Sequence, residues 1–159
     1  SSVDPFILSA CTGRILSFLI AREFYHIPLI NRLFRWAGYI PVRRDGRDIG
    51  SLRRALTALN HGRALCIFPQ GGIDRDWSEA KDGTAYLAWR SKAPVIPAGI
   101  SGTPQGQSVW RPLLMQSCSQ TRFGPPFPPP PDPTDRQNRE QVAIWTGRLM
   151  KTIAGLSKD

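Results

Sequence analysis

The first two thirds of the chain alternate between short apolar runs and amphipathic segments. Four apolar runs predict buried strands: residues 14–21, 38–42, 64–68 and 94–100. The core of the first run, residues 15–21, is bounded by Arg14 and Arg22. Because about 20 apolar residues are needed to cross a bilayer, this run predicts a core strand. Pro41 places the second run at the edge or end of a sheet.

Between the runs, apolar positions recur with the period of a helix. The clearest helix follows Asp48, a suitable N-cap, and ends before Gly62, where a C-terminal glycine cap is expected. Its apolar residues share one face: Ile49, Leu52, Leu56 and Leu59. Less regular patterns predict helices at residues 28–36 and 82–91.

The order strand, helix, strand, helix, strand over residues 38–100 predicts right-handed crossovers. We therefore expect an α/β fold, a single domain with a mostly parallel central sheet flanked by helices. A length of 159 residues fits one domain. Residues 109–115 and 121–123 are expected to add shorter strands.

Seven of the nine residues 125–133 are proline, which predicts an extended connector. Its two interpretations are a stiff strap across the surface and a ligand for an SH3-like domain. Thr134 or Asp135 then caps a last helix whose apolar residues share one face: Val142, Trp145, Leu149, Ile153 and Leu156. The predicted organisation is a core at residues 1–124, a connector at 125–133 and a helix packing on the same domain at 134–159.

The chain is strongly basic, with a net charge of +9 and a pI near 10.3. Residues 14–63 hold ten Arg against three acidic residues, a balance of +7. Such charge favours anionic partners, namely phosphate esters, anionic lipid or nucleic acid, although a merely solvated face is the alternative. The three cysteines have no metal-type spacing and their odd number argues against a disulfide framework, so we interpret them as reduced, cytoplasmic thiols.

Two segments that follow predicted strands have residues suited to binding an anion. Residues 68–76 contain adjacent glycines, Gly71 and Gly72, whose backbone amides can approach an anion that Arg75 could clamp. Residues 38–44 form an apolar strand that ends in two guanidinium groups. In parallel sheets, ligands bind at the carboxyl ends of strands, so we expect both segments at one site.

Together these segments complete a four-block pattern that resembles the glycerophospholipid acyltransferase family, typified by 1-acylglycerol-3-phosphate acyltransferases. Ser1 to Phe6 are similar to the tail of the family's first block, Asn-His, four residues, then Asp. Gly38 to Arg44 resemble the second block, Phe68 to Arg75 resemble the third, and Val95 to Ile100 followed by Gly102-Thr103 resemble the fourth. The resemblance covers roughly residues 1–127 and implies a glycerol-3-phosphate acyltransferase-like fold.

The resemblance implies that a histidine five positions before Asp4, upstream of Ser1, takes the proton from an acceptor hydroxyl. Asp4 would be its catalytic partner and would orient the imidazole; the alternative is that Asp4 only caps the following helix. The substrate-binding residues implied are Arg44, Gln70, Gly71, Gly72 and Arg75, with Arg44 and Arg75 on the acceptor's phosphate or headgroup. The implied reaction needs no metal and no cofactor beyond the acyl-CoA or acyl carrier protein thioester.

The resemblance implies transfer of a fatty acyl group to a lysophospholipid, with 1-acylglycerol-3-phosphate as the favoured acceptor, in phospholipid biosynthesis or remodelling. We expect the protein at the cytoplasmic face of a membrane, peripheral or anchored by a segment upstream of Ser1, next to anionic lipid. Since the chain begins at Ser1 without Met, we expect the natural protein to start further upstream and these 159 residues alone to lack turnover.

Gln70 stands where the family has Glu, and Gly72 and Ile73 stand where it has Thr and Arg. A catalytically degenerate, lipid-binding homologue is therefore an alternative. A basic nucleic-acid-binding domain is a weaker one, because residues 14–63 contain no recognition motif and we expect no specific nucleic acid partner. We interpret His26 and His61 as non-catalytic, and Cys66 as a core residue and not a nucleophile.

Overall fold

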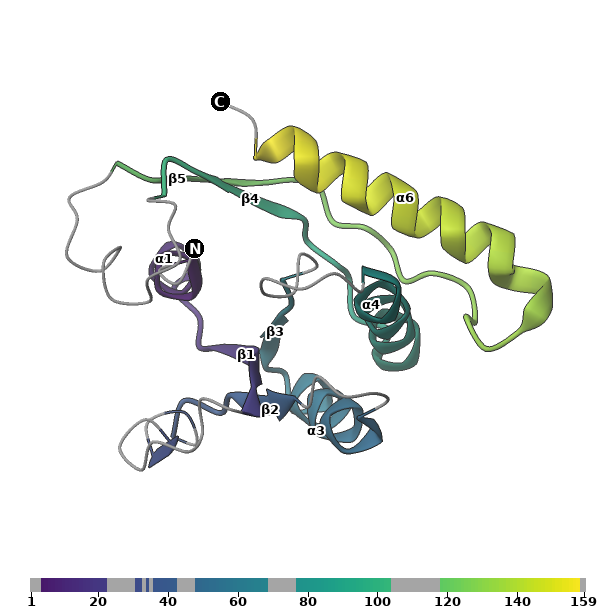
Figure 1. The fold of residues 1–159 in the computed structure, drawn as a ribbon, viewed down its shortest axis with the longest axis horizontal. Coiled ribbons are helices and arrows are strands. Elements are labelled where there is room, and N and C mark those ends of the chain that lie inside the picture. The colour runs from purple at the N-terminus through teal and green to yellow at the C-terminus, as the bar shows by residue number, and fades with distance from the viewer. Residues whose placement is uncertain are drawn as a thin grey trace.

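The computed structural model describes residues 4–22, 31–32, 34, 36–42, 48–68, 77–103 and 118–157. The elements are drawn in Figure 1 and follow one another in this order: α1 (Asp4–Thr12), β1 (Leu16–Ala21), β2 (Ile40–Val42), α3 (Ile49–Asn60), β3 (Ala64–Cys66), α4 (Trp77–Ser91), β4 (Ala98–Ser101), β5 (Gln120–Phe123), η2 (Arg136–Asn138) and α6 (Arg139–Leu156).

The first three strands form a parallel sheet in the order β2-β1-β3. β1 lies in the middle, with Leu19 opposite Ile40 in β2 and Leu16 opposite Ala64 in β3. β2, which contains Pro41, is an edge strand of this sheet, as predicted for a strand whose proline cannot donate a ladder hydrogen bond. A parallel sheet with flanking helices confirms the predicted α/β class.

The two faces of the parallel sheet are covered by different apolar clusters. On one face, Leu8 of α1 packs with Leu16 and Phe18 of β1. On the other face, Ile40 of β2 packs with Ala55 of α3 and Leu87 of α4. Alternation along the strands explains this division, because successive side chains of a strand point to opposite faces. The sheet is therefore enclosed by α1 on one side and by α3 and α4 on the other.

The predicted helix after Asp48 is α3. The Asp48 carboxylate accepts a hydrogen bond from the Ser51 amide at 3.0 Å, and Gly62 follows the helix with a φ of +74°. The centre of its buried face is formed by Ser51 and Ala55, with the leucines at the margins, whereas Ile49 is 61% exposed. Ile49 was predicted on the same face as these leucines, but it precedes Ser51 by two residues, about 200° around the helix, and therefore points away from the buried face.

One strand differs from the prediction. The run at residues 94–100 becomes β4, which begins at Ala98 and pairs antiparallel with β5 instead of extending the parallel sheet. Ala98 and Ile100 pack against the Phe18 cluster, while Gly99, on the opposite face of the ribbon, lies against the end of α6. These contacts with two distant segments favour pairing of β4 with β5, and the apolar pattern of the sequence does not predict them.

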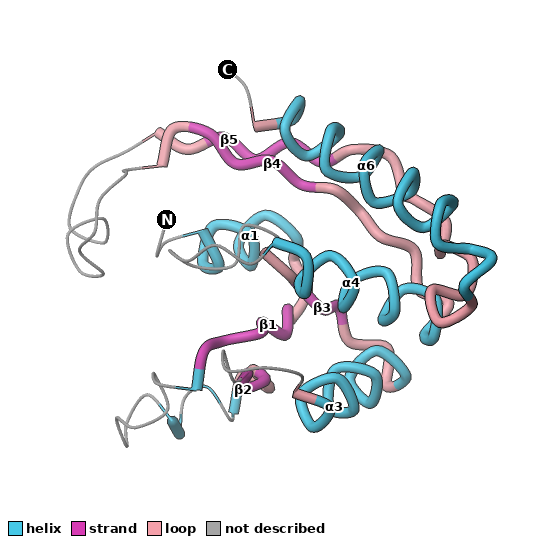
Figure 2. The backbone as a smooth tube through the Cα atoms, turned by 45° about the vertical axis from the view of Figure 1, so that its right-hand side comes forward, coloured by secondary structure: helices cyan, strands magenta, loops and turns pink. Residues whose placement is uncertain are grey.

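The proline-rich connector runs next to β4 and α6 (Figure 2). Val95 and Phe127 exchange backbone hydrogen bonds of 2.9 and 2.7 Å. The indole of Trp145 donates to the Pro128 carbonyl at 2.8 Å, and Pro130 is buried. These contacts favour the surface strap over a peptide ligand, because much of the connector is already held by its own chain.

The last helix has the predicted start and apolar face. Asp135 caps η2 by accepting from the Gln137 amide at 2.9 Å, and α6 follows directly. Leu149 is buried in α6. α4 begins five residues before the predicted start of 82, at Trp77. The predicted strand at 109–115 and most of the predicted helix at 28–36 lie outside the described residues, although Asn31, Arg32, Phe34 and Trp36 are helical. Within the described ranges, no helix has the length and apolarity required to traverse a membrane.

Candidate functional site

The structure places one of the candidate residues, Asp4, at the carboxyl edge of the parallel sheet. α1 runs back against β1, so that its Asp4 end lies toward the end of β1 (Figure 2). The chain also leaves β2 and β3 at this edge, since the three strands are parallel. Asp4 is thus placed at the edge from which the second and third blocks continue.

Asp4 is the first residue of α1 and is half-buried, with its Oδ1 atom shielded from solvent. Leu8, one turn later on the same side of the helix, is 5% exposed and anchors α1 on the sheet. A carboxylate in the first turn is stabilised by the helix dipole. This position suits both interpretations of Asp4, as a helix-terminal residue and as the group that orients a histidine, and its assignment stays a prediction.

The second block enters the site through β2. Its glycine, Gly38, has a φ of +72°, and the guanidinium of Arg63 lies directly over it, where any Cβ would stand. Tyr39 packs on Phe18, and the Pro41 carbonyl accepts a hydrogen bond from Arg54 at 3.4 Å. Arg44, the expected phosphate-binding residue of this block, lies outside the described residues.

The third block begins where β3 ends. Phe68, its first residue, is described and packs on the Phe18 ring. The four predicted binding residues that follow it lie outside the described residues: Gln70, Gly71, Gly72 and Arg75. The structure therefore places the strand that carries this block and leaves the role of these residues as a prediction.

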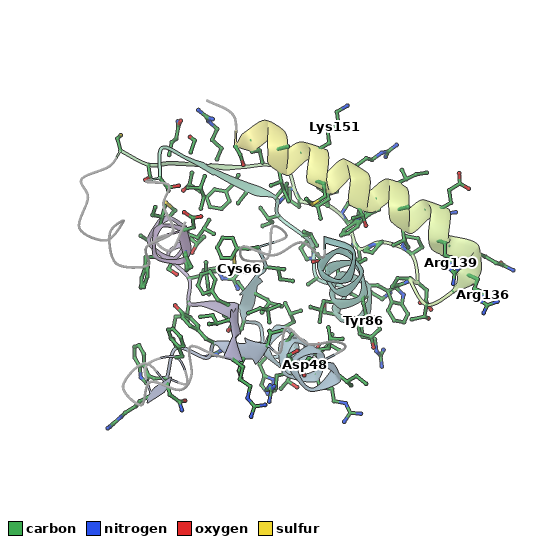
Figure 3. All side chains as sticks on the ribbon, viewed as in Figure 1. Asp48, Cys66, Tyr86, Arg136, Arg139 and Lys151 are labelled. Carbon is green, nitrogen blue, oxygen red and sulfur yellow. The ribbon has the colours of Figure 1, made fainter. Side chains whose placement is uncertain are left out.

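Cys66 behaves as a core residue. Its side chain packs on the Phe18 cluster near the centre of the molecule (Figure 3). Burial raises the pKa of the Cys66 thiol to about 12. A thiol of that pKa is neutral near pH 7, whereas the thiolate is the nucleophile. This agrees with the interpretation of Cys66 as packing.

His61 lies at the other end of the sheet from Asp4. It terminates α3, and its Nδ1 is 2.7 Å from the Thr57 carbonyl oxygen. That end of α3 leads into the start of β3, so His61 belongs to the amino edge. His26 lies outside the described residues. Among the residues that the structure describes, no group of three or more His, Cys, Asp or Glu side chains could hold a metal ion.

The fourth block supports the site from the ribbon of β4 and β5. Ala98 and Ile100 contact the Phe18 cluster, so this block reaches the same core as Tyr39 of the second block and Phe68 of the third. Gly102 ends β4 with a φ of +72°, and a Cβ there would overlap the Cys118 carbonyl oxygen. The sequence alone did not single out Phe18 as the residue that these blocks share, because an apolar strand shows burial without showing what it contacts.

Comparisons with known proteins agree with this architecture. The family model described as Acyltransferase matches residues 1–101. The 1-acyl-sn-glycerol-3-phosphate acyltransferase of Bacillus subtilis is 23% identical over 96 residues, which are 60% of this chain and 48% of that protein. The probable 1-acyl-sn-glycerol-3-phosphate acyltransferase of Mycoplasma pneumoniae is 27% identical over 111 residues, which are 65% of this chain and 42% of that protein. The chain thus spans about half the length of these curated relatives.

A solved structure has a similar fold. The crystal structure of the 1-acyl-sn-glycerophosphate acyltransferase PlsC from Thermotoga maritima superimposes with a TM-score of 0.52 at 22% sequence identity. The match covers 91% of this chain and 59% of that chain. At this identity the likeness bears on the fold, and it supports the α/β class derived from the sheet.

Proposed function

The chain belongs to the Acyltransferase family, and on that premise we propose that the protein is a glycerolipid O-acyltransferase. It moves a fatty acyl group from an acyl thioester to a hydroxyl of a lysophospholipid in phospholipid biosynthesis or remodelling, and its acceptor is 1-acylglycerol-3-phosphate. The observation that carries the proposal is the family match over residues 1–101, which contains the first three blocks and Val95 to Ile100 of the fourth. The names of the relatives from Bacillus subtilis and Mycoplasma pneumoniae support this acceptor.

In the proposed reaction the acceptor hydroxyl oxygen attacks the thioester carbonyl carbon, a C–O bond forms and the C–S bond breaks. The hydroxyl proton passes to the histidine of the first block and from there to the departing thiolate. Asp4 holds the imidazole in the tautomer that can accept the proton and stabilises the imidazolium that results. The acyl-CoA or acyl carrier protein thioester is a co-substrate, and the step requires no other cofactor.

The surroundings of Asp4 support this role. Its half-buried carboxylate, with one shielded oxygen, lies in a less polar environment than bulk water, where a charged hydrogen bond to an imidazole is stronger. Leu8 holds α1 on the sheet and keeps Asp4 at the carboxyl edge. We assign acceptor binding to Arg44, Gln70, Gly71, Gly72 and Arg75, on the basis of the sequence pattern.

We further propose that the protein acts at the cytoplasmic face of a membrane. An acceptor with a long acyl chain resides in a lipid surface, and the net charge of +9 favours anionic lipid. Residues 1–124 would form the catalytic core, residues 125–133 the strap, and residues 134–159 the helix that packs on that core.

A catalytically degenerate homologue that binds lipids is the second candidate function. The substitution of Gln70 for the expected Glu favours it, since Gln keeps an acceptor oxygen but loses the negative charge. Gln70 is also compatible with a site adapted to another headgroup. The variant Gln70→Glu distinguishes this adaptation from a loss of function.

The test uses the protein produced from its complete gene, with lysophosphatidic acid in mixed micelles and a radiolabelled acyl-CoA. We expect labelled phosphatidic acid, and we expect Asp4→Asn to lower kcat by about 10²- to 10⁴-fold, because the imidazole loses its orienting carboxylate. Turnover that is unchanged in Asp4→Asn would overturn the assignment of Asp4. Binding of lysophosphatidic acid without turnover would establish the second candidate instead.

Gln70→Glu is measured in the same assay with a panel of lysophospholipids. If Gln70 adapts the site to another acceptor, Glu changes the order of preference among headgroups. If Gln70 is a loss of function, Glu raises the rate on lysophosphatidic acid and leaves the order unchanged.

A further inference from the structure

The ring of Phe18 lies at the centre of the cluster that faces α1. It is 1% exposed and is the largest of the fully buried side chains in the described part of the chain. Its strand, β1, contains none of the four sequence blocks. Burial of a phenylalanine alone indicates only packing, so the argument depends on what the ring contacts.

Phe18 contacts the second and third blocks through aromatic pairs. The Tyr39 ring meets it edge to face, with centroids 5.2 Å apart and an interplanar angle of 82°. The Phe68 ring stacks on it, with centroids 6.1 Å apart and an angle of 11°. Both arrangements are favourable for aromatic pairs and restrict how each ring can rotate. The Phe18 ring thus packs next to the start of β2 and the end of β3.

The helix that carries Asp4 and the fourth block reach the same cluster. Leu8, one turn after Asp4, is buried with Phe18, and Ala98 and Ile100 pack against that pair from β4. Residues of the second, third and fourth blocks, together with Leu8 of the helix that carries Asp4, therefore pack around Phe18, which belongs to none of the blocks. A change in the volume of that side chain alters the separation between α1 and the end of β3 directly.

We propose that Phe18 is a positioning residue of the acyl transfer site, a role that rests on the proposed function. It acts through Leu8, which carries Asp4, and through Phe68, which precedes the glycine-containing segment. Displacement of catalytic groups by about 1 Å can cost about 100-fold in rate, because reaction requires near-attack geometry. The cluster on the other face of the sheet contains Ile40 of the second block but neither Leu8 nor Phe68.

The matched control is Leu87 of α4, which is 3% exposed in the cluster on the opposite face. Phe18→Leu and Leu87→Val remove similar volumes from two buried clusters of the same sheet. We expect both variants to lower Tm to a similar extent. Only Phe18→Leu is expected to lower kcat on lysophosphatidic acid, by tenfold or more, with a smaller change in KM, because the defect lies in alignment. Leu87→Val should keep kcat within twofold.

A second measurement does not depend on turnover. Hydrogen exchange should rise in Phe18→Leu for peptides covering residues 4–12 and 64–68 together, whereas Leu87→Val should affect α3 and α4. Equal losses of kcat in the two variants, or unchanged exchange at residues 4–12 in Phe18→Leu, would overturn the proposal. If Phe18→Leu fails to fold, Phe18→Met, whose unbranched side chain has a similar volume to leucine and adapts better to an irregular space, is measured in its place under the same criteria. An inactive unsubstituted protein would overturn the proposed function, and the exchange data would still decide whether Phe18 couples these segments.

Discussion

The contact between Gly99 and the end of α6 predicts a measurable loss of stability in Gly99→Ala. A Cβ at this position would stand 2.6 Å from both the Leu156 carbonyl oxygen and the Ser157 amide nitrogen. Favourable contacts of this kind lie near 3.5 Å, so the backbone at the end of α6 must retreat by about 1 Å. Backbone atoms of a helix cannot move aside as a flexible side chain can.

The size of the effect follows from two opposing contributions. Overpacking costs about 1–3 kcal/mol, and replacing a strand glycine returns about 0.5–1 kcal/mol through the entropy of the unfolded chain. At the middle of both ranges, the net loss in the free energy of unfolding is about 1 kcal/mol. For a protein of this size that corresponds to a decrease in Tm of about 2–4 °C.

The assay is thermal unfolding followed by circular dichroism, with Gly147→Ala as the matched control. Gly147 is in α6, and a Cβ there would meet nothing within 4 Å. Because alanine favours a helix over glycine by about 0.8–1 kcal/mol, Gly147→Ala should raise Tm. If Gly99→Ala equals or exceeds the unsubstituted protein in Tm while Gly147→Ala is stabilised, the packing of α6 on β4 inferred here is refuted.

Two further predictions concern buried groups of the parallel sheet. Ser17 is 0% exposed, and its hydroxyl has no hydrogen-bond partner in the part of the chain that the structure describes. Ser17→Ala should therefore leave the urea midpoint of unfolding unchanged or raise it by up to the equivalent of about 1–2 kcal/mol. A clear decrease in the midpoint would show that the hydroxyl is hydrogen-bonded. Burial raises the pKa of Cys66 to about 12 from an ordinary value of about 9, so at pH 8.5 an alkylating reagent should modify the exposed thiols of Cys11 and Cys118 first. The unfolded chain releases the Cys66 proton near pH 9 while the folded chain retains it, so the contribution of Cys66 to stability is complete below pH 9 and declines as the pH rises toward 12. Equal rates of alkylation at all three cysteines in the folded protein would contradict the burial of Cys66.

Local features of the sequence determined the elements and their order. The capping carboxylate of Asp48, the helical spacing that follows it and the positive φ at Gly62 concern neighbouring residues, and α3 has the predicted start and end. The alternation of strands and helices predicted the parallel sheet for the same reason, since each crossover is a local connection. The four blocks were recognised in sequence order, and the family match agrees with them.

The candidate site was predictable as a set of residues but not as an arrangement. Asp4 has a described position at the carboxyl edge, whereas Arg44, Gln70, Gly71, Gly72 and Arg75 lie outside the described residues and remain predictions. One side of α1 is buried against β1 and β4, so that Leu8 points inward and Asp4 stays at the sheet. The nine residues of α1 do not by themselves determine these contacts.

Only the tertiary structure decided which distant segments meet. An apolar run such as residues 94–100 predicts burial. The strand with which it pairs depends on packing against segments that are far apart in the chain. β4 joins β5 because Ala98 and Ile100 fit the Phe18 cluster on one face and Gly99 admits the end of α6 on the other. The contacts of Phe18 with Tyr39 and Phe68 have the same origin, since contacts between side chains separated by tens of residues leave no periodic signal in the sequence.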